Sequence, residues 1–289
     1  MMDFLASWPL FLRPYLLTLT AAALLSLVGV VAAARRQVFV AAAVAQASTL
    51  GYALFGLFAG GSVISGLSLA LRDALSVAAA VLAAALTMLG GAGLREGSRL
   101  DADELTAAVF ILGGAGSVLA LSGAPAGMEQ LRRLQASSVI GASTPDVVAL
   151  AVLLIAAAAF LLVRHRALVL VLTDPVLAAA IGLRLWAWNL GLAVACGLTL
   201  GLAVRSTGVL YAFAVLALPV MIAKQFSGRV RDLLVAAPAV AVGCGLLGLY
   251  LAYDFDLPPG QVIAVLLCLL LTLAALARTA WEAAAAGPA

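Results

Sequence analysis

The side chains that usually bind metal ions or catalyse reactions are few in this sequence and far apart. The single histidine, His165, lies between two arginines, a position typical of a membrane-surface residue rather than a ligand. The three cysteines, Cys196, Cys244 and Cys268, stand alone in apolar stretches without a CxxC pair, as small packing residues do. The sequence therefore predicts no catalytic residue, no metal site and no cofactor.

The charged residues also limit how the chain could obtain energy for transport. All thirteen acidic residues fall in loops or at the ends of apolar segments, whereas ion-coupled carriers usually place a carboxylate at mid-membrane. No Gly-Lys pair is present, so the chain has no phosphate-binding P-loop. These features favour a transporter driven by a separate ATPase subunit. A secondary carrier, a channel-like protein and a non-transporting membrane subunit remain alternatives.

The composition assigns these residues to helices in a lipid bilayer. The 289 residues are 65% hydrophobic and 10% charged, and a soluble domain cannot bury that much apolar surface. The apolar stretches are long and do not alternate with polar residues, which favours helices over barrel strands. We expect an all-α polytopic membrane protein with eight or nine transmembrane helices in one domain, residues 1–289. The basic residues are scattered, so no nucleic-acid partner is expected.

The positions of the basic residues predict the orientation of these helices. The expected spans are 14–34, 38–60, 74–92, 104–123, 146–163, 186–204, 207–224, 232–252 and 261–277. With nine spans and an external N-terminus, eleven of the sixteen lysines and arginines lie on the cytoplasmic side and five outside. Since basic residues are enriched in cytoplasmic loops, we expect an inner-membrane protein with its N-terminus outside and its C-terminus in the cytoplasm.

Four stretches carry a resemblance to a known family, and they occur in the family's order. Residues 26–56 contain a basic pair before the second span, and residues 173–189 contain an Asp followed by Ala-x-x-x-Gly. Residues 206–226 contain Pro219 and Ala223 at the family's positions, and residues 253–267 contain a turn similar to Asp-x-Pro-x-Gly. Together they resemble the permease subunits of zinc/manganese/iron-type ABC importers. The resemblance covers the chain from about Ser26 to Arg278.

This chain departs from the family at its metal-ligating positions. In the family, Asp and His lie one helical turn apart on the second span, and such side chains are preferred ligands of transition metals. Here these positions are Ala42 and Gln46, and a later family histidine is lost near Ile111. Gln46 could contact a passing ligand or form an interhelical hydrogen bond, and both interpretations stay open. A degenerate permease with a non-metal substrate is therefore a further alternative.

The resemblance implies a type II ABC importer bundle that works as a homodimer. Substrate would pass between two copies by alternating access, and a cytosolic ATPase and an extracytoplasmic substrate-binding protein would be the partners. The candidate pathway residues are Gln46, Ser48 and Pro219. Pro219 interrupts helix hydrogen bonding, so it is either a hinge beside the path or an inert kink.

Two polar segments are candidate contact sites for those partners. Residues 174–184 begin with Asp-Pro, which favours a helix start, and the family makes this segment the ATPase coupling helix, with Asp174, Ala178 and Gly182 at its motif positions. An amphipathic connector on the membrane is the alternative. Asp254 and Asp256 could contact the binding protein or lie in a solvated loop. The low-complexity tail 282–289 is expected to be flexible.

Overall fold

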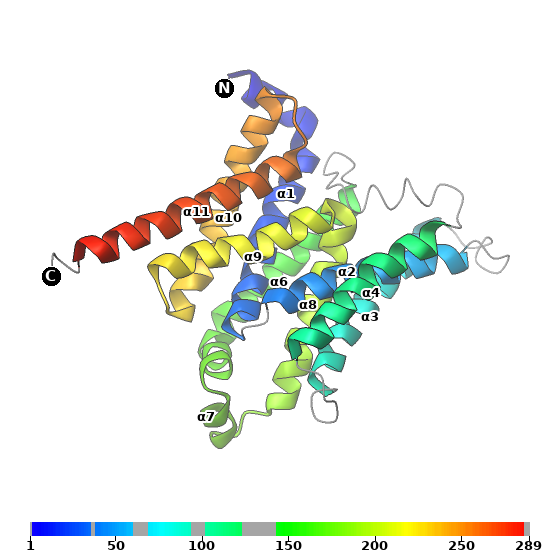
Figure 1. Ribbon diagram of the computed structural model, residues 1–289. Helices are drawn as coiled ribbons and strands as arrows, with labels where there is room; N and C mark the ends of the chain where they lie inside the picture. The colour runs from blue at the N-terminus through cyan, green and yellow to red at the C-terminus, as the bar shows by residue number, and fades with distance from the viewer. Residues whose placement is uncertain (1, 36–37, 60–68, 94–101, 123–142, 286–289) are drawn as a thin grey trace.

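The computed structural model describes residues 2–35, 38–59, 69–93, 102–122 and 143–285, and all regular structure in these ranges is α-helical (Figure 1). The helices are α1 (Met2–Ala34), α2 (Val38–Ala59), α3 (Leu69–Gly93), α4 (Ala102–Ser122), α6 (Thr144–Thr173), α7 (Pro175–Ala180), α8 (Leu185–Thr207), α9 (Val209–Phe226), α10 (Val230–Asp254) and α11 (Pro259–Ala285).

Eight of the helices in the described ranges are long and apolar enough to cross a membrane, which confirms the all-α polytopic fold. The expected span 74–92 lies in α3, whose described apolar stretch, Ala74–Ala83, is shorter than a full span. The directions of α2 and α4 show in which direction α3 runs. Phe39 packs on Phe110 with ring centroids 5.9 Å apart, and Leu50 lies beside Gly116 further along both helices. Thus α2 and α4 run parallel, and the 25-residue α3 returns the chain between them.

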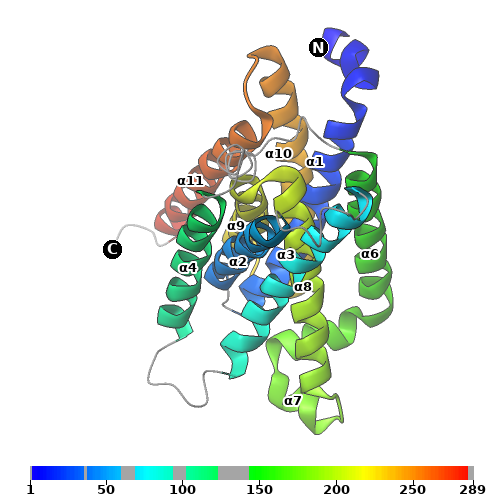
Figure 2. The same cartoon turned by 90° about the vertical axis from the view of Figure 1, so that its right-hand side faces the viewer.

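Helix α1 is the most buried of the apolar helices in the described ranges, and α6 lies at the edge of the bundle (Figure 2). Of the apolar window of α1, 72% is buried inside the protein, compared with 6% for α6. The Tyr211 hydroxyl of α9 is fully buried and donates a 2.7 Å hydrogen bond to the Thr18 carbonyl of α1. Because an unpaired buried hydroxyl is costly, this bond fixes α9 against α1.

The closest approach of α1 and α9 occurs at a glycine. A Cβ atom built on Gly29 would overlap the carbonyl oxygen of Leu216, which is a backbone atom and has little freedom to move. Small residues allow membrane helices to pack backbone against backbone. Gly29 therefore sets the distance between α1 and the segment of α9 that precedes Pro219.

Helix α6 continues past the predicted end of its span. The sequence placed that end at 163, but the structure keeps residues 164–173 helical, so this boundary was wrong. Arginine, leucine and alanine are good helix formers, and the segment contains no breaker before Asp174. The ring of Pro175 disfavours helical geometry at the preceding residue, and Asp174 accordingly takes φ −141° and ψ 84°.

Helix α11 also extends further than its expected span 261–277. It continues to Ala285, four residues into the segment 282–289 for which the sequence predicts a flexible tail. Alanine-rich sequence has high helix propensity, and Arg278 Nε lies 2.8 Å from Glu282 Oε1 one turn away, a favourable pair on a helix surface. Residues 286–289 of the predicted tail lie outside the described residues.

Candidate functional site

Helix α7 is a six-residue helix closed at both ends by its own sequence. The Asp174 carboxylate accepts a 2.9 Å hydrogen bond from the Leu177 amide, as an N-cap residue does. At the other end, the Gly182 and Leu183 amides donate to the Ala179 and Ala178 carbonyls at 2.9 and 3.0 Å. This is a Schellman cap, and it requires the left-handed φ of +88° that Gly182 adopts. The helix itself covers only Pro175–Ala180 of the predicted 174–184.

The side chains of α7 are mostly turned outward. Only Ala178 is buried, at 0% exposure, whereas Leu177 and Ile181 are 48% and 62% exposed. They lie four positions apart, which places them on the same side of the segment. The structure thus brings Asp174, Ala178 and Gly182 together in one capped turn that presents apolar side chains at the end of the bundle.

Two polar contacts join the C-terminal end of α1 to α8 and α9. Arg35 Nη2, just after α1, donates a 2.8 Å hydrogen bond to Asn189 Oδ1 of α8, and Lys224 Nζ of α9 donates to the Ala33 carbonyl at 3.1 Å. A cation at a helix C-terminus also interacts favourably with the helix dipole. Burial lowers the pKa of the Arg35 guanidinium, although arginine remains charged in proteins. These contacts connect the C-terminal end of α1 to both α8 and α9.

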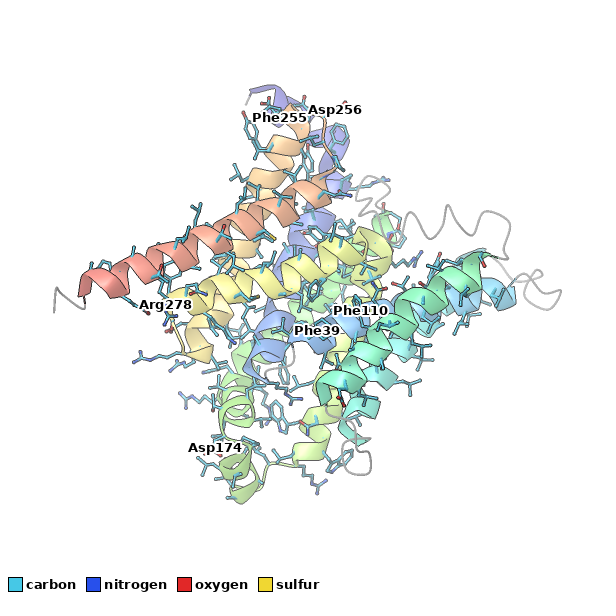
Figure 3. The ribbon with its side chains drawn as sticks, viewed as in Figure 1. Phe39, Phe110, Asp174, Phe255, Asp256 and Arg278 are labelled. Atoms are coloured by element: carbon cyan, nitrogen blue, oxygen red, sulfur yellow. The ribbon has the colours of Figure 1, made fainter. Side chains whose placement is uncertain are left out.

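The turn between α10 and α11 lies at the opposite end of the molecule from α7 (Figure 3). Asp254 and Asp256 are both exposed there. Asp256 has a φ of 53°, a left-handed conformation that aspartate tolerates better than most residues. The Leu257 amide donates to the Ala252 carbonyl at 2.9 Å and closes the end of α10. The two carboxylates are thus presented on a capped turn.

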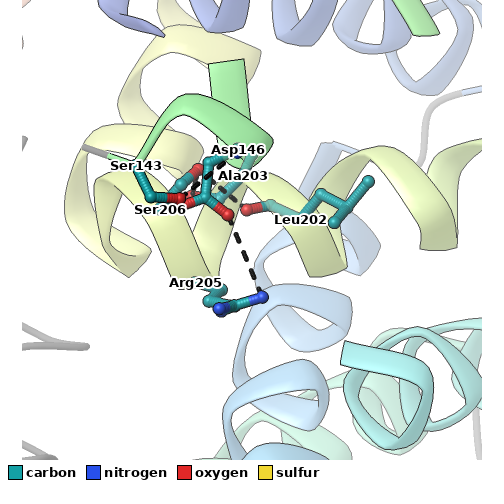
Figure 4. Close-up of polar contacts among 6 residues, drawn as sticks. All are labelled: Ser143, Asp146, Leu202, Ala203, Arg205 and Ser206. Carbon is teal, nitrogen blue, oxygen red and sulfur yellow. Dashed lines mark hydrogen bonds and ion pairs between the residues drawn. The ribbon is translucent and has the colours of Figure 1, made fainter. Parts of the chain in front are cut away.

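A polar cluster that sequence reasoning missed joins α6 and α8 at the ends far from α7 (Figure 4). The Ser143 hydroxyl caps α6 and contacts Asp146 Oδ2 at 2.5 Å, and Asp146 Oδ1 lies 3.9 Å from Arg205 Nη1 of α8. The Ser-Thr-Pro-Asp sequence at 143–146 resembles a capping box, and this signal could have located the start of α6. Nothing in the sequence pairs Asp146 with Arg205.

Replacing Ser143 with alanine should lower the stability of the protein by about 1 kcal/mol, because the first turn of α6 loses its side-chain cap. The measurement is the midpoint of thermal or denaturant unfolding in detergent micelles. Ser143→Thr keeps a capping hydroxyl and is the matched control. Equal midpoints for the two variants would show that the cap contributes nothing.

The predicted pathway residues do not gather on one surface. Gln46 of α2 lies against α4, where a Cβ atom built on Gly113 would be 2.7 Å from the Gln46 carbonyl carbon. In the described part of the chain, neither the half-buried Gln46 amide nor the buried Ser48 hydroxyl has a hydrogen-bond partner. The two lie two positions apart in a helix and so face different sides. Pro219 is buried inside α9.

The positions that carry the family's metal ligands differ in their exposure. Ala42 is buried at 4%, whereas Ile111 of α4 is 65% exposed. Within the described residues, no group of three or more His, Cys, Asp or Glu side chains could hold a metal ion.

Known proteins place this bundle in a family. The profile of the ABC 3 transport family matches residues 7–278, nearly the whole chain. The chain belongs to the ABC 3 transport family. The family resemblance predicted from four sequence stretches is confirmed.

Relatives and a solved structure agree with this membership. A probable metal transport system membrane protein of Chlamydia trachomatis is 33% identical over 101 residues, 35% of this chain and 34% of the relative. The manganese transport system membrane protein MntB of Synechocystis is 30% identical over 137 residues, 47% of this chain and 45% of the relative. The matched part of the chain thus spans about a third of the first of these curated relatives and less than half of the second.

The fold matches over a greater length than the sequence does. The structure of PsaBC from Streptococcus pneumoniae in complex with Fab superposes with a TM-score of 0.79 and 16% identity, covering 95% of both chains. This similarity shows that the ABC 3 family member described here has the permease fold.

Proposed function

We propose that this chain is the membrane-spanning subunit of an ATP-binding-cassette importer for divalent metal ions such as zinc, manganese or iron. It works as a homodimer and moves its substrate between the two copies by alternating access. The family match over residues 7–278 is the observation that carries this proposal, and the metal transport proteins among its relatives support the substrate class.

The contact with the ATPase is assigned to α7. Asp174, Ala178 and Gly182 build a rigid capped turn, and the exposed Leu177 and Ile181 offer apolar surface for a groove on a cytosolic partner. The structural links from Arg35 to α8 and from Lys224 to α1 would pass a displacement of this end to the core helices. ATP binding and hydrolysis take place in the partner, which biases a two-state equilibrium of the permease.

The opposite end is assigned to the extracytoplasmic side, with an external N-terminus and a cytoplasmic C-terminus. Asp254 and Asp256 are exposed there on a capped turn and would meet basic residues of a substrate-binding protein. The distribution of arginines and lysines supports this orientation.

The substrate path is assigned to Gln46 of α2; the buried Ser48, on another side of α2, and Pro219, a flexible point in the neighbouring helix α9, would act on the path through helix packing. The amide oxygen of Gln46 is a hard neutral ligand that interacts only weakly with a passing metal ion. Weak contacts suit conduction, because a substrate that binds tightly at mid-membrane is released slowly. Because neutral oxygen ligands do not require a metal ion, a permease with a non-metal substrate remains the alternative.

Uptake into sealed proteoliposomes tests the function. The chain is reconstituted with its partner ATPase and substrate-binding protein, and accumulation of radioactive zinc, manganese or iron is measured with and without ATP. We expect uptake that needs ATP, and no uptake when the ATPase carries an inactivated P-loop. Uptake that is unaffected by ATP would instead favour a secondary carrier or a channel. If none of the three metals is transported with all partners bound, the metal assignment is overturned.

A further inference from the structure

An apolar pocket of about 580 Å³ lies between α1, α6 and α8, and neither Gln46 nor any residue of α7 lines it. Its volume is in the range of pockets that bind small molecules. Leu24 and Val28 of α1, Leu153 and Phe160 of α6, and Leu192 of α8 form its walls. Gly191 of α8 also lines the pocket and is exposed. The pocket is therefore open at the α8 surface, where the bilayer surrounds the protein.

One end of the pocket has a different chemistry. Arg164 of α6 lines it there and is exposed, and no carboxylate among the described residues forms an ion pair with it. Trp188 of α8 lies at the same end, with its ring centroid 5.8 Å from that of Phe160. Tryptophan and arginine are the residues that typically lie at the level of lipid headgroups. The pocket thus has one cationic, aromatic end and an apolar remainder.

The part of the pocket between Arg164 and its far end at Leu153 matches one leaflet of a bilayer in length. Leu153 and Arg164 both line it and lie eleven positions apart on α6, which corresponds to about 16 Å along a helix. Half of a hydrocarbon core measures about 15 Å. An acyl chain whose phosphate is at Arg164 would therefore reach the far end of the pocket near mid-membrane.

We propose that this pocket binds an anionic phospholipid, with its phosphate at Arg164 and an acyl chain between α6 and α8. The charge at one end, the apolar walls and the length of one leaflet are all features of this ligand. The site is independent of the proposed transport function, since it uses none of the residues assigned to the path, the ATPase contact or the binding protein.

Native mass spectrometry of the purified full chain tests the site, with phosphatidylglycerol and phosphatidylcholine as the lipid probes. Gly191→Leu would fill the pocket, and the first atom of the new side chain has open space around it. We expect this variant to lose bound phosphatidylglycerol. Arg164→Gln should weaken phosphatidylglycerol binding by about fivefold, the effect expected of one cation near an anionic headgroup, and should not change phosphatidylcholine binding.

Two matched controls separate the site from general effects on folding. Gly243→Leu makes the same change at an exposed glycine of α10 that also has open space, and Arg166→Gln removes a neighbouring exposed cation that does not line the pocket. Both should bind phosphatidylglycerol as the unmodified chain does. Equal retention of the two lipids by the unmodified chain, or loss of lipid in the controls to the same extent, would overturn the proposal. If the unmodified chain is instead a dimer without bound lipid, and Gly191→Leu dissociates that dimer, a second copy of the chain covers the pocket and the proposal is overturned.

Discussion

Replacing Leu177 and Ile181 with aspartate should reduce co-purification of the ATPase by about 30-fold or more, because a central apolar contact contributes about 2 kcal/mol or more to an interface. Both side chains are exposed on α7 and contribute little to the packing of the permease itself. ATP-driven uptake should fall with complex formation. The measurement is the amount of ATPase recovered with affinity-purified permease, followed by the uptake assay.

Phe255→Asp is the matched control for this experiment. Phe255 is also an exposed apolar residue, at 64%, but it lies at the opposite end of the molecule (Figure 3). We expect this variant to recover the ATPase normally. Full recovery of the ATPase by the folded Leu177→Asp, Ile181→Asp variant would remove α7 from the interface, while the family membership and the fold would stand.

Gly29→Ala should destabilise the folded protein by about 3 kcal/mol, at the upper end of the usual cost of overpacking. The new methyl group would overlap the Leu216 carbonyl oxygen, so the backbones of α1 and α9 must separate. Because α1 is the most buried of the apolar helices, this separation also disturbs its contacts with the rest of the bundle. The measurement is the unfolding midpoint in detergent, together with the fraction of monodisperse protein.

Gly243→Ala provides the comparison for this change. An added methyl group at Gly243 meets no atom within 4 Å, and alanine has a helix propensity about 1 kcal/mol better than glycine. The control should therefore be as stable as the unmodified chain or slightly more stable. If Gly29→Ala unfolds at the same midpoint as Gly243→Ala, the close approach of α1 and α9 does not limit the stability of the bundle.

The sequence predicted the helices well because each one must satisfy its own backbone in lipid, which is a local requirement. Their ends were predicted less well where no local signal is strong. The span was ended at 163 because the charged Arg164 follows, yet arginine is a good helix former and the helix continues to Thr173. Asp174 and Pro175 gave the correct boundary, since their effect on the backbone is local.

The contacts between helices could not be predicted in the same way. Gly201 belongs to a Gly-x-x-x-Gly pattern and does pack closely, since a Cβ atom built there would be 2.8 Å from Val81 Cγ2 of α3. The pattern does not say which helix is the partner. Gly29 and the pair Asp146–Arg205 carry no pattern, because their partners are distant in sequence. Gln46 lies against Gly113 and Gly114 of α4, a placement that no pattern in the sequence predicts.

The unbroken length of α6 has a mechanical consequence. Its 30 residues form a rod of about 45 Å from its Ser143 cap to Asp174. The Asp146–Arg205 pair joins this rod to α8 at one end, and α7 connects the same two helices at the other. A force applied to α7 is therefore expected to rotate α6 and α8 together about the end that the Asp146–Arg205 pair joins. A small displacement at the α7 end would become a tilt along the whole length of α6.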